Sequence, residues 1–403
     1  MLAMWTASAD IGVKCTCAGF SPLSDFLAVG TDDGAVSIFN PKTGRILSKL
    51  GASYTKSTNS LSSALEDNGR GMTMSVRFNP ASPSKPKARV ALSTGIVEGW
   101  DIKTKSSNAT NVVENGQTLA LDYGPDGRHY AAGGMDQQTP DNRGHAVRVY
   151  DDATSKLVRS LEGDCLAQGH SNRISCVRFK KDRELASGSM DGTIKLWSIG
   201  SKDPIASLPG GSDGTFEIIG NSIDFYGDYM IVGSARPHKH LLLYDMRMNR
   251  LVSEVAWRKM KPAASAAARR WNVAKLASLQ KTNIIAAGFV DGKIVAGGSG
   301  SNMVKVFNPI RSSAPVAADA FPVDQSTAEN GELRDLYKPV ARFEVPSAVM
   351  GLHVSPQPVL RKGELIGDQE CREDAKIIAV AASSGQVYGV KMPSSNSTSE
   401  PII

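Results

Sequence analysis

Residues 169–198 constrain the fold of this chain more than any other part of it. They read GHSNRISCVRFKKDRELASGSMDGTIKLWS, which is three short strand-like runs separated by Lys181-Asp182 and Asp191-Gly192. Dipeptides of this kind suit tight hairpin turns because Asp and Gly tolerate positive φ. The segment therefore predicts three antiparallel strands in succession. A sheet this small needs neighbours to cover both of its faces, so further copies are expected along the chain.

Seven positions repeat the end of the third predicted strand. Each follows an apolar run, and all but the last are aromatic: Phe39, Trp100, Tyr150, Trp197, Tyr244, Phe307 and Val390. Runs of small apolar residues precede them, for example at 27–30 and 230–233. Such runs suit central strands that are buried on both faces. We therefore predict an all-β chain that contains seven small sheets.

The Gly-His start, the Ser-Gly-Ser-x-Asp-Gly centre and the Leu-Trp-Ser end of residues 169–198 resemble a WD40 repeat, in which Asp usually stands where this chain has Ser198. The resemblance implies a seven-bladed WD40-type β-propeller. Neighbouring markers lie 47 to 83 residues apart, which exceeds the roughly 40 to 45 residues of an undecorated repeat. The propeller is therefore expected to carry loop insertions.

The resemblance also gives four polar residues a structural role. In WD40 blades a His, a Ser, an Asp and a Trp form one buried hydrogen-bonded network, and the matching residues are His170, Ser187, Asp191 and Trp197. A hydrolase triad is the alternative for the first three. We disfavour it because Ser187 lacks the Gly-x-Ser-x-Gly context of a nucleophile elbow.

One closed ring is expected over residues 1–392, followed by a disordered tail at 393–403. Residues 1–9 are apolar and strand-like, and we predict that they close the last blade, with Leu2, Met4 and Trp5 pairing against residues 386–392. The expected blades span, in order, residues 11–50, 72–112, 117–162, 169–208, 216–257, 273–318 and 345–392.

The positive charge of the chain is concentrated in one segment. The formal net charge is +6, yet residues 236–281 alone contain eleven Lys or Arg and two acids. This basic segment suits an acidic protein partner. The alternative is a solvated loop whose two Trp side chains return to the core. Nucleic acid and a membrane surface are disfavoured, because neither an RRM motif nor Phe-Arg-Arg-Gly occurs. The candidate partner-binding residues are Trp257, Arg258, Lys259, Lys261, Arg269, Arg270 and Trp271.

Cofactor, metal and catalytic motifs are not expected. The five cysteines lack the spacing of a zinc or redox site, and the six histidines are scattered over different predicted blades. Residues 297–300 are rich in Gly but lack the Gly-Lys-Ser of a phosphate loop. The chain has no signal peptide or long apolar run. We therefore predict no cofactor, no metal and an intracellular, chiefly cytoplasmic location, with the cytoskeleton and the nucleus left open.

Members of the WD40 family mostly bind other proteins, so the resemblance implies a non-enzymatic scaffold or an adaptor subunit of a larger complex. Two narrower roles stay open. Substrate receptors of cullin-RING ubiquitin ligases carry a Trp-Asp-x-Arg box, to which Tyr244, Asp245 and Arg247 are similar, with Tyr in place of Trp. Trp100-Asp101-Ile102-Lys103 is similar, with Lys in place of Arg. A cytoskeletal or axonemal subunit would instead use the basic segment to bind acidic surfaces.

Overall fold

The secondary structure of the described residues is entirely β-strand. The computed structural model of the chain describes residues 3–8, 13–51, 71–112, 116–136, 145–163, 169–209, 217–236, 240–255, 257, 282–309, 337–359, 365–366, 369–370 and 375–392. No helix long and apolar enough to cross a bilayer occurs in these ranges.

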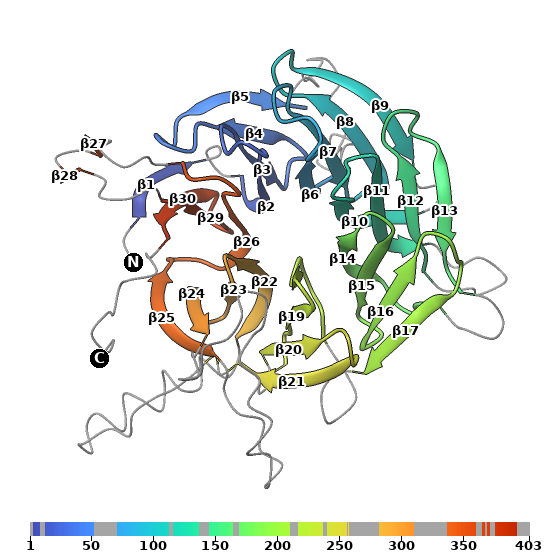
Figure 1. The fold of residues 1–403 in the computed structure, drawn as a ribbon. Helices are drawn as coiled ribbons and strands as arrows, with labels where there is room; N and C mark the ends of the chain where they lie inside the picture. The colour runs from blue at the N-terminus through green and yellow to red at the C-terminus, as the bar shows by residue number, and fades with distance from the viewer. Residues whose placement is uncertain are drawn as a thin grey trace, which may run out of the picture.

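The described strands form seven antiparallel four-stranded sheets, arranged as blades around a central axis (Figure 1). We call the region along this axis the channel. Blades 1 to 4 are consecutive meanders: β2 (Cys15–Phe20), β3 (Leu27–Thr31), β4 (Val36–Phe39) and β5 (Ile46–Leu50); β6 (Thr73–Phe78), β7 (Lys87–Leu92), β8 (Ile96–Asp101) and β9 (Ser106–Val112); β10 (Gly116–Tyr123), β11 (His129–Asp136), β12 (Val147–Asp151) and β13 (Leu157–Leu161); β14 (Ile174–Lys181), β15 (Glu184–Ser189), β16 (Thr193–Ser198) and β17 (Pro204–Pro209).

Blades 5 and 6 are also meanders, whereas blade 7 combines strands from both ends of the chain. Their strands are β18 (Ile223–Tyr226), β19 (Tyr229–Gly233), β20 (Leu241–Asp245) and β21 (Arg250–Glu254); β22 (Asn283–Val290), β23 (Lys293–Ser299), β24 (Met303–Pro309) and β25 (Tyr337–Glu344); β26 (Val349–Val354), β29 (Ile377–Ala382), β30 (Gln386–Lys391) and β1 (Ala3–Ser8). A separate hairpin, β27 (Leu365–Ile366) and β28 (Gln369–Glu370), lies between β26 and β29 in sequence.

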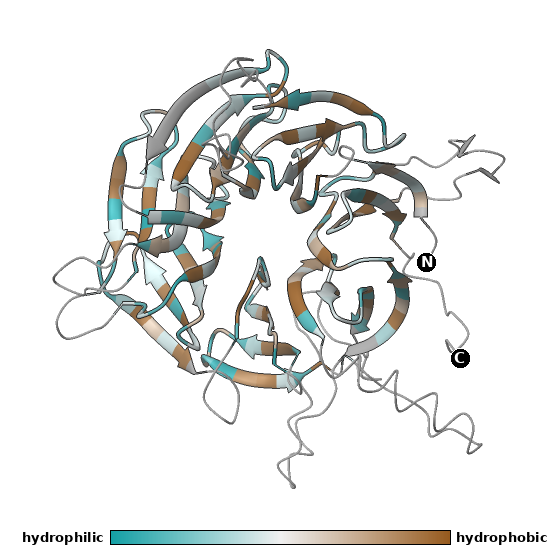
Figure 2. Ribbon diagram, turned by 180° about the vertical axis from the view of Figure 1, so that it is seen from behind, coloured by the Kyte–Doolittle hydropathy of each residue, from teal (hydrophilic) through white to brown (hydrophobic). Residues whose placement is uncertain are grey.

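The hydrophobic core is divided among the junctions between neighbouring blades. Each hydrophobic cluster of the described residues joins two adjacent sheets, such as blades 5 and 6 or blades 7 and 1. The second strands β3, β19 and β29 are buried along their whole length. Figure 2 shows apolar segments on strands around the ring. This burial on both faces accounts for the continuous runs of small apolar residues in these strands.

The strand pattern confirms the prediction of a seven-bladed β-propeller. All seven markers lie on the third strand of a blade, including Val390 on β30, which runs between β29 and β1. An aromatic residue is therefore not required at this position. Val390 is fully buried and packs with Val380 and Tyr388 in the cluster between blades 6 and 7.

The ring is closed by β1, which pairs antiparallel with β30 from Ala3 opposite Val390 to Ser8 opposite Gln386. Trp5 on β1 also reaches the first blade, where its indole N–H donates a 2.8 Å hydrogen bond to the carbonyl of Pro41. Its ring occupies the space beside Gly44 and Gly389, so a Cβ at either glycine would overlap it. Trp5 therefore ties blade 7 to blade 1. Leu2 lies outside the described residues.

Blade 6 extends further along the chain than residues 273–318. Its outer strand is β25, and Glu344 lies opposite Met303 of β24. The pairing shifts register between Val306 and Phe307, which accommodates Pro339 within this edge strand. The difference arises because the outer strand follows residues 310–336, which lie outside the described ranges, rather than beginning immediately after β24.

Candidate functional site

The two faces of the ring carry different connections. In each meander the turns between strands one and two and between strands three and four lie on one face, which we call the lower face. The turns between strands two and three, and the connections from one blade to the next, lie on the opposite, upper face. This distinction follows from the antiparallel order of the strands.

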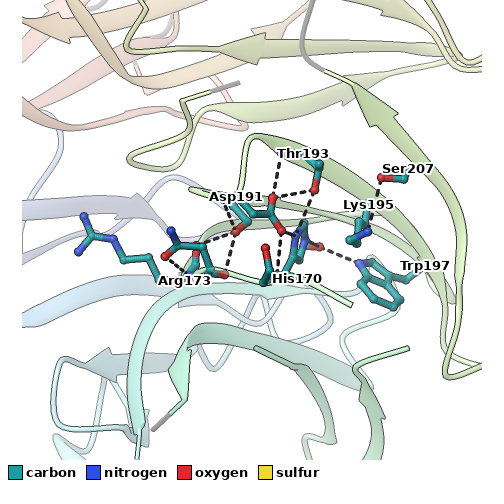
Figure 3. A network of polar contacts seen from close by, with 11 residues as sticks. His170, Arg173, Asp191, Thr193, Lys195, Trp197 and Ser207 are labelled. Carbon is teal, nitrogen blue, oxygen red and sulfur yellow. Dashed lines mark hydrogen bonds and ion pairs between the residues drawn. The ribbon is translucent and has the colours of Figure 1, made fainter. Parts of the chain in front are cut away.

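The four predicted network residues of blade 4 form one continuous chain of hydrogen bonds (Figure 3). The indole N–H of Trp197 donates to Ser187 Oγ, and the Ser187 hydroxyl donates to His170 Nε2, both at 2.7 Å. His170 Nδ1 donates to Asp191 Oδ2, also at 2.7 Å. Because an ionised carboxylate only accepts hydrogen bonds, this arrangement assigns the proton of the neutral imidazole to Nδ1.

The environment of this network fixes its protonation. Burial alone would raise the pKa of Asp191, but hydrogen bonds from His170 and Thr193 lower it to about 2. Burial lowers the pKa of His170 below its usual value, so the ring stays neutral near pH 7. Ser187 is 0% exposed. A nucleophile must reach its substrate, so this serine has the hydrogen bonds of a triad without the access that catalysis requires.

The start of the predicted partner-binding surface lies in the core. Trp257 is 3% exposed and belongs to the cluster between blades 5 and 6. Its ring is 6.1 Å from that of Phe307, and Lys305 Nζ lies 4.6 Å from the indole centroid. Lys305 also donates a hydrogen bond to the carbonyl of Trp257. Trp257 is therefore a core residue rather than part of an exposed surface, because the chain after β21 packs back against blade 6.

The other six candidate partner-binding residues lie outside the described ranges, namely Arg258, Lys259, Lys261, Arg269, Arg270 and Trp271. Thr282, the first described residue after them, is 0% exposed. Both flanks of residues 258–281 are thus anchored between blades 5 and 6, in a connection between blades.

The predicted ligase-adaptor box lies at the end of β20, where the chain enters the lower-face turn to β21. Tyr244 and Asp245 are each 3% exposed, whereas the side chain of Arg247 is 60% exposed. Arg247 folds onto the Asp245 carboxylate, with its NH2 donating to Oδ2 at 2.7 Å and its Nε donating to Oδ1 at 3.1 Å. In the second similar sequence, Lys103 Nζ donates to the Ser84 carbonyl at 2.8 Å.

The structure also reveals a set of channel residues that the sequence analysis missed. The first strand of every blade contains a Val-x-Phe-like run, as in Val76-Arg77-Phe78 and Val177-Arg178-Phe179. The middle residue of this run occupies an equivalent position in each blade. The seven residues at this position, from blade 1 to blade 7, are Gly19, Arg77, Asp122, Arg178, Asp224, Gly288 and His353.

Four of these residues form a chain of alternating charges across blades 2 to 5, which we call the channel ion-pair chain. Arg77 Nε lies 3.2 Å from Asp122 Oδ1, Arg178 NH1 lies 3.3 Å from the same oxygen, and Arg178 NH2 lies 2.8 Å from Asp224 Oδ1. Burial alone would lower the pKa of Arg178, but Asp224 and Asp122 raise it above its usual value. The chain therefore alternates two arginine and two aspartate side chains, with Arg178 paired to both aspartates.

A pocket of about 320 Å³ is lined by Arg178 and Asp224 of this chain and by further residues of blades 5 to 7. Gly288 contributes no side chain there, and His353 borders the space. The pocket extends to the lower face, where its lining residues Asp291 and Lys376 form a 3.0 Å ion pair and the Asp291 side chain is 66% exposed. Burial and the charges of nearby arginines lower the pKa of His353 to about 3, so its ring is neutral. No group of three or more potential metal ligands occurs among the described residues.

Comparison with known proteins places this architecture among recognised repeats. A family model described as "WD domain, G-beta repeat" matches residues 5–40 and 163–198. The second match contains the hydrogen-bonded network of blade 4. The first begins at Trp5, which ties blade 7 to blade 1, and continues through the first three strands of blade 1.

Three curated relatives share part of the chain. Coatomer subunit beta'-2 of Oryza sativa subsp. japonica is 41% identical over 73 residues, which is 17% of this chain and 8% of the relative. Cell division cycle 20.1, cofactor of APC complex, of Arabidopsis thaliana is 28% identical over 108 residues, or 26% and 21% of the two chains. The serine-threonine kinase receptor-associated protein of Dictyostelium discoideum is 36% identical over 74 residues, or 18% and 20%. The chain therefore spans about a fifth or less of the length of these relatives.

Proposed function

Because the chain belongs to the WD40-repeat family of β-propeller proteins, we propose that it is a non-enzymatic scaffold or adaptor subunit that holds other proteins within a larger complex. One observation carries the proposal: the Ser187–His170–Asp191 constellation, with Ser187 0% exposed, is enclosed within blade 4 and bonded to Trp197. These groups stabilise the blade and leave recognition to the faces and insertions of a rigid ring. Relatives named as a coatomer subunit and as a cofactor of the APC complex support this proposal.

The basic segment is the docking site that we propose for an acidic protein partner. Residues 258–281 carry seven Lys or Arg and no acid, and they connect the buried residues Trp257 and Thr282. Anchoring at both flanks would hold the segment at one junction of the ring. Exposed charges attract an acidic partner over about one Debye length, so the interaction should weaken steeply as salt rises.

The test compares two variants with equal loss of charge. In the first, Arg258, Lys259, Lys261, Arg269 and Arg270 are changed to Ser. In the control, five exposed lysines elsewhere are changed to Ser: Lys42, Lys85, Lys156, Lys181 and Lys202. Binding of a fluorescent polyglutamate peptide is measured by anisotropy at 50 and 200 mM salt, and proteins recovered by affinity purification from the native cells are compared.

Selective loss of peptide binding and of a defined set of proteins from the first variant supports docking on the basic segment. Equal recovery of the same proteins by both variants excludes this docking site while retaining the scaffold role. If even the unaltered protein recovers no defined partner, the scaffold proposal itself is wrong.

A ubiquitin-ligase receptor is the second candidate function, and the geometry of Arg247 favours it. The guanidinium is exposed on the lower face, yet two hydrogen bonds to the buried Asp245 carboxylate fix its direction. A fixed, exposed arginine suits recognition by another protein. Arg247→Ala should abolish co-purification of the ligase's propeller adaptor, whereas Arg250→Ala, an exposed change nearby, should not. Unchanged recovery with Arg247→Ala would remove this candidate.

A further inference from the structure

We propose that the pocket at the lower mouth of the channel binds an uncharged apolar side chain of a partner peptide, together with an adjacent amide carbonyl. At this site Gly288 contributes no side chain, which leaves space beside the axis, and apolar residues of blades 5 and 6 form the rim. This inference rests on the proposed scaffold function, because it describes how one partner would be held.

The charges around the pocket favour an occupant without net charge. Arg178 is paired with both Asp122 and Asp224, and Lys376 is paired with Asp291 at the opening. Each charged side chain that lines the pocket therefore already has an opposite partner. A charged ligand would lose its hydration without gaining an unpaired counter-charge, which makes its burial unfavourable.

The hydrogen bonds around the pocket favour an acceptor on the occupant. The Asp224 carboxylate is already occupied, because Oδ1 accepts from Arg178 and Oδ2 accepts from the Phe289 N–H at 2.7 Å. His353 Nδ1 accepts from the Phe20 N–H at 3.4 Å, which leaves the proton of the neutral ring on Nε2. The side-chain oxygen of Asn221 is contacted by a thiol at 3.7 Å, whereas its amide N–H₂ forms no hydrogen bond to the described residues. The His353 ring already interacts with the Val354 backbone, so the Asn221 amide is the donor that the pocket offers, and an amide carbonyl is the neutral acceptor that a peptide supplies.

The rim and size of the pocket favour a single apolar side chain. Phe289 and Val290 line the opening and are half-buried. Tyr226, at the neighbouring lower-face turn, is 43% exposed, and its ring lies 5.8 Å from that of Phe289. A volume of about 320 Å³ is near the lower limit of small-ligand pockets, which leaves room for about one aromatic group and its amide.

Three probes with the same aromatic ring test the charge requirement. They are N-acetylphenylalaninamide, which is neutral, N-acetylphenylalanine, which is an anion, and phenylalaninamide, which is a cation. Binding to the full chain is measured by saturation-transfer NMR titration at pH 6, where the amine of phenylalaninamide is protonated. We expect the neutral probe to bind with millimolar affinity and each charged probe to bind about tenfold more weakly, because burial of an unpaired charge is unfavourable.

Variants locate the binding on the molecule. Val290→Arg should block the opening, and Asn221→Leu should remove a donor while leaving a side chain of similar size. Met248→Arg, at a position 59% exposed on the lower face and outside the pocket, is the matched control for Val290→Arg. Urea midpoints establish that each variant is folded before it is titrated.

Loss of neutral-probe binding with both pocket variants, and its retention with Met248→Arg, supports the proposal. Equal affinity for the three probes, no binding of the neutral probe, or unchanged binding by Val290→Arg overturns it. Recovery of partners in the affinity purification is measured separately. Failure of the pocket is therefore distinguishable from failure of the scaffold function.

Discussion

Replacing Asp122 by Asn tests whether the channel ion-pair chain stabilises the ring. The Asp122 side chain is 6% exposed, and it accepts hydrogen bonds from three donors on two other blades. Oδ1 accepts from Arg77 and Arg178, and Oδ2 accepts from the Phe179 N–H at 2.9 Å. Asn keeps the shape of the side chain but has one acceptor oxygen and one donor group. Its amide N–H₂ would therefore face either the guanidinium groups or the Phe179 N–H, and all of these are donors.

The expected loss of stability arises because the substitution leaves an arginine without its carboxylate partner. Arg77 loses its only described carboxylate partner, whereas Arg178 keeps Asp224. Removing one partner of a buried ion pair costs about 3 to 5 kcal/mol, and this range includes the cost of the poorly solvated charge left behind. We therefore expect Asp122→Asn to lower the free energy of unfolding by about 3 to 5 kcal/mol.

Equilibrium unfolding in urea is the assay, followed by tryptophan fluorescence and by circular dichroism. At an m value of about 3 kcal/mol/M, this loss lowers the unfolding midpoint by about 1 to 1.7 M. Agreement between the two signals is required before a free energy is derived, because chains of this size can unfold in several steps.

Asp291→Asn is the matched control. It removes the same charge and also breaks an ion pair, but the Asp291 side chain is 66% exposed. Asp291 has φ +50°, a conformation that Asn also tolerates. An exposed pair contributes about 0 to 1 kcal/mol, so the control should shift the midpoint little. Equal shifts for the two variants would refute the assigned role of the channel chain.

Three further predictions concern the hydrogen-bonded network of blade 4, the closure of the ring by Trp5 and the pH dependence of stability. Ser187→Ala should lower the free energy of unfolding by about 2 to 3 kcal/mol, since a buried donor and a buried acceptor lose their partner; an unchanged urea midpoint would contradict this. Trp5→Ala should lower it by about 3 kcal/mol and accelerate amide hydrogen exchange in β1 and β30, and exchange spread evenly over all blades would contradict closure by Trp5. Burial lowers the pKa of His170, and burial with nearby arginines lowers that of His353 to about 3. The unfolded chain therefore binds more protons below about pH 6.5, and each histidine should reduce stability by up to about 1.4 kcal/mol per pH unit as pH falls toward its folded pKa. Urea midpoints that stay constant from pH 7 to 4.5 would show this reasoning to be wrong.

The ring could be predicted from the sequence because its central strands repeat a pattern set by burial. Short runs such as residues 27–30 and 230–233 become second strands that are covered on both sides, and apolar residues suit that environment. The outer strand of blade 6 was harder to predict. Its sequence, YKPVARFE, contains a proline and several polar residues. An edge strand of this kind is determined by pairing with β24 rather than by its own composition.

The channel site could not be predicted from local patterns. Arg77, Asp122, Arg178 and Asp224 are separated from one another by 45 or more residues. Within its own strand, each is a polar residue between two apolar neighbours, which is the usual pattern of a solvent-facing position. Only the ring brings them together. Aligning the Val-x-Phe-like runs of the seven blades is the step that would have revealed the alternating charges.

The pairing of β1 with β30 also determines the order in which the protein can be completed during synthesis. Ala3 leaves the ribosome hundreds of residues before Val390, its partner in the last sheet. Until then β1 has no sheet to join, and its apolar residues stay accessible to chaperones or to a strand of another chain. Closure is therefore a late event, and among the described strands it pairs the residues that lie farthest apart in sequence. Conditions that slow synthesis of the C-terminal blade should prolong the period in which an open ring can exchange its first strand with a neighbouring molecule.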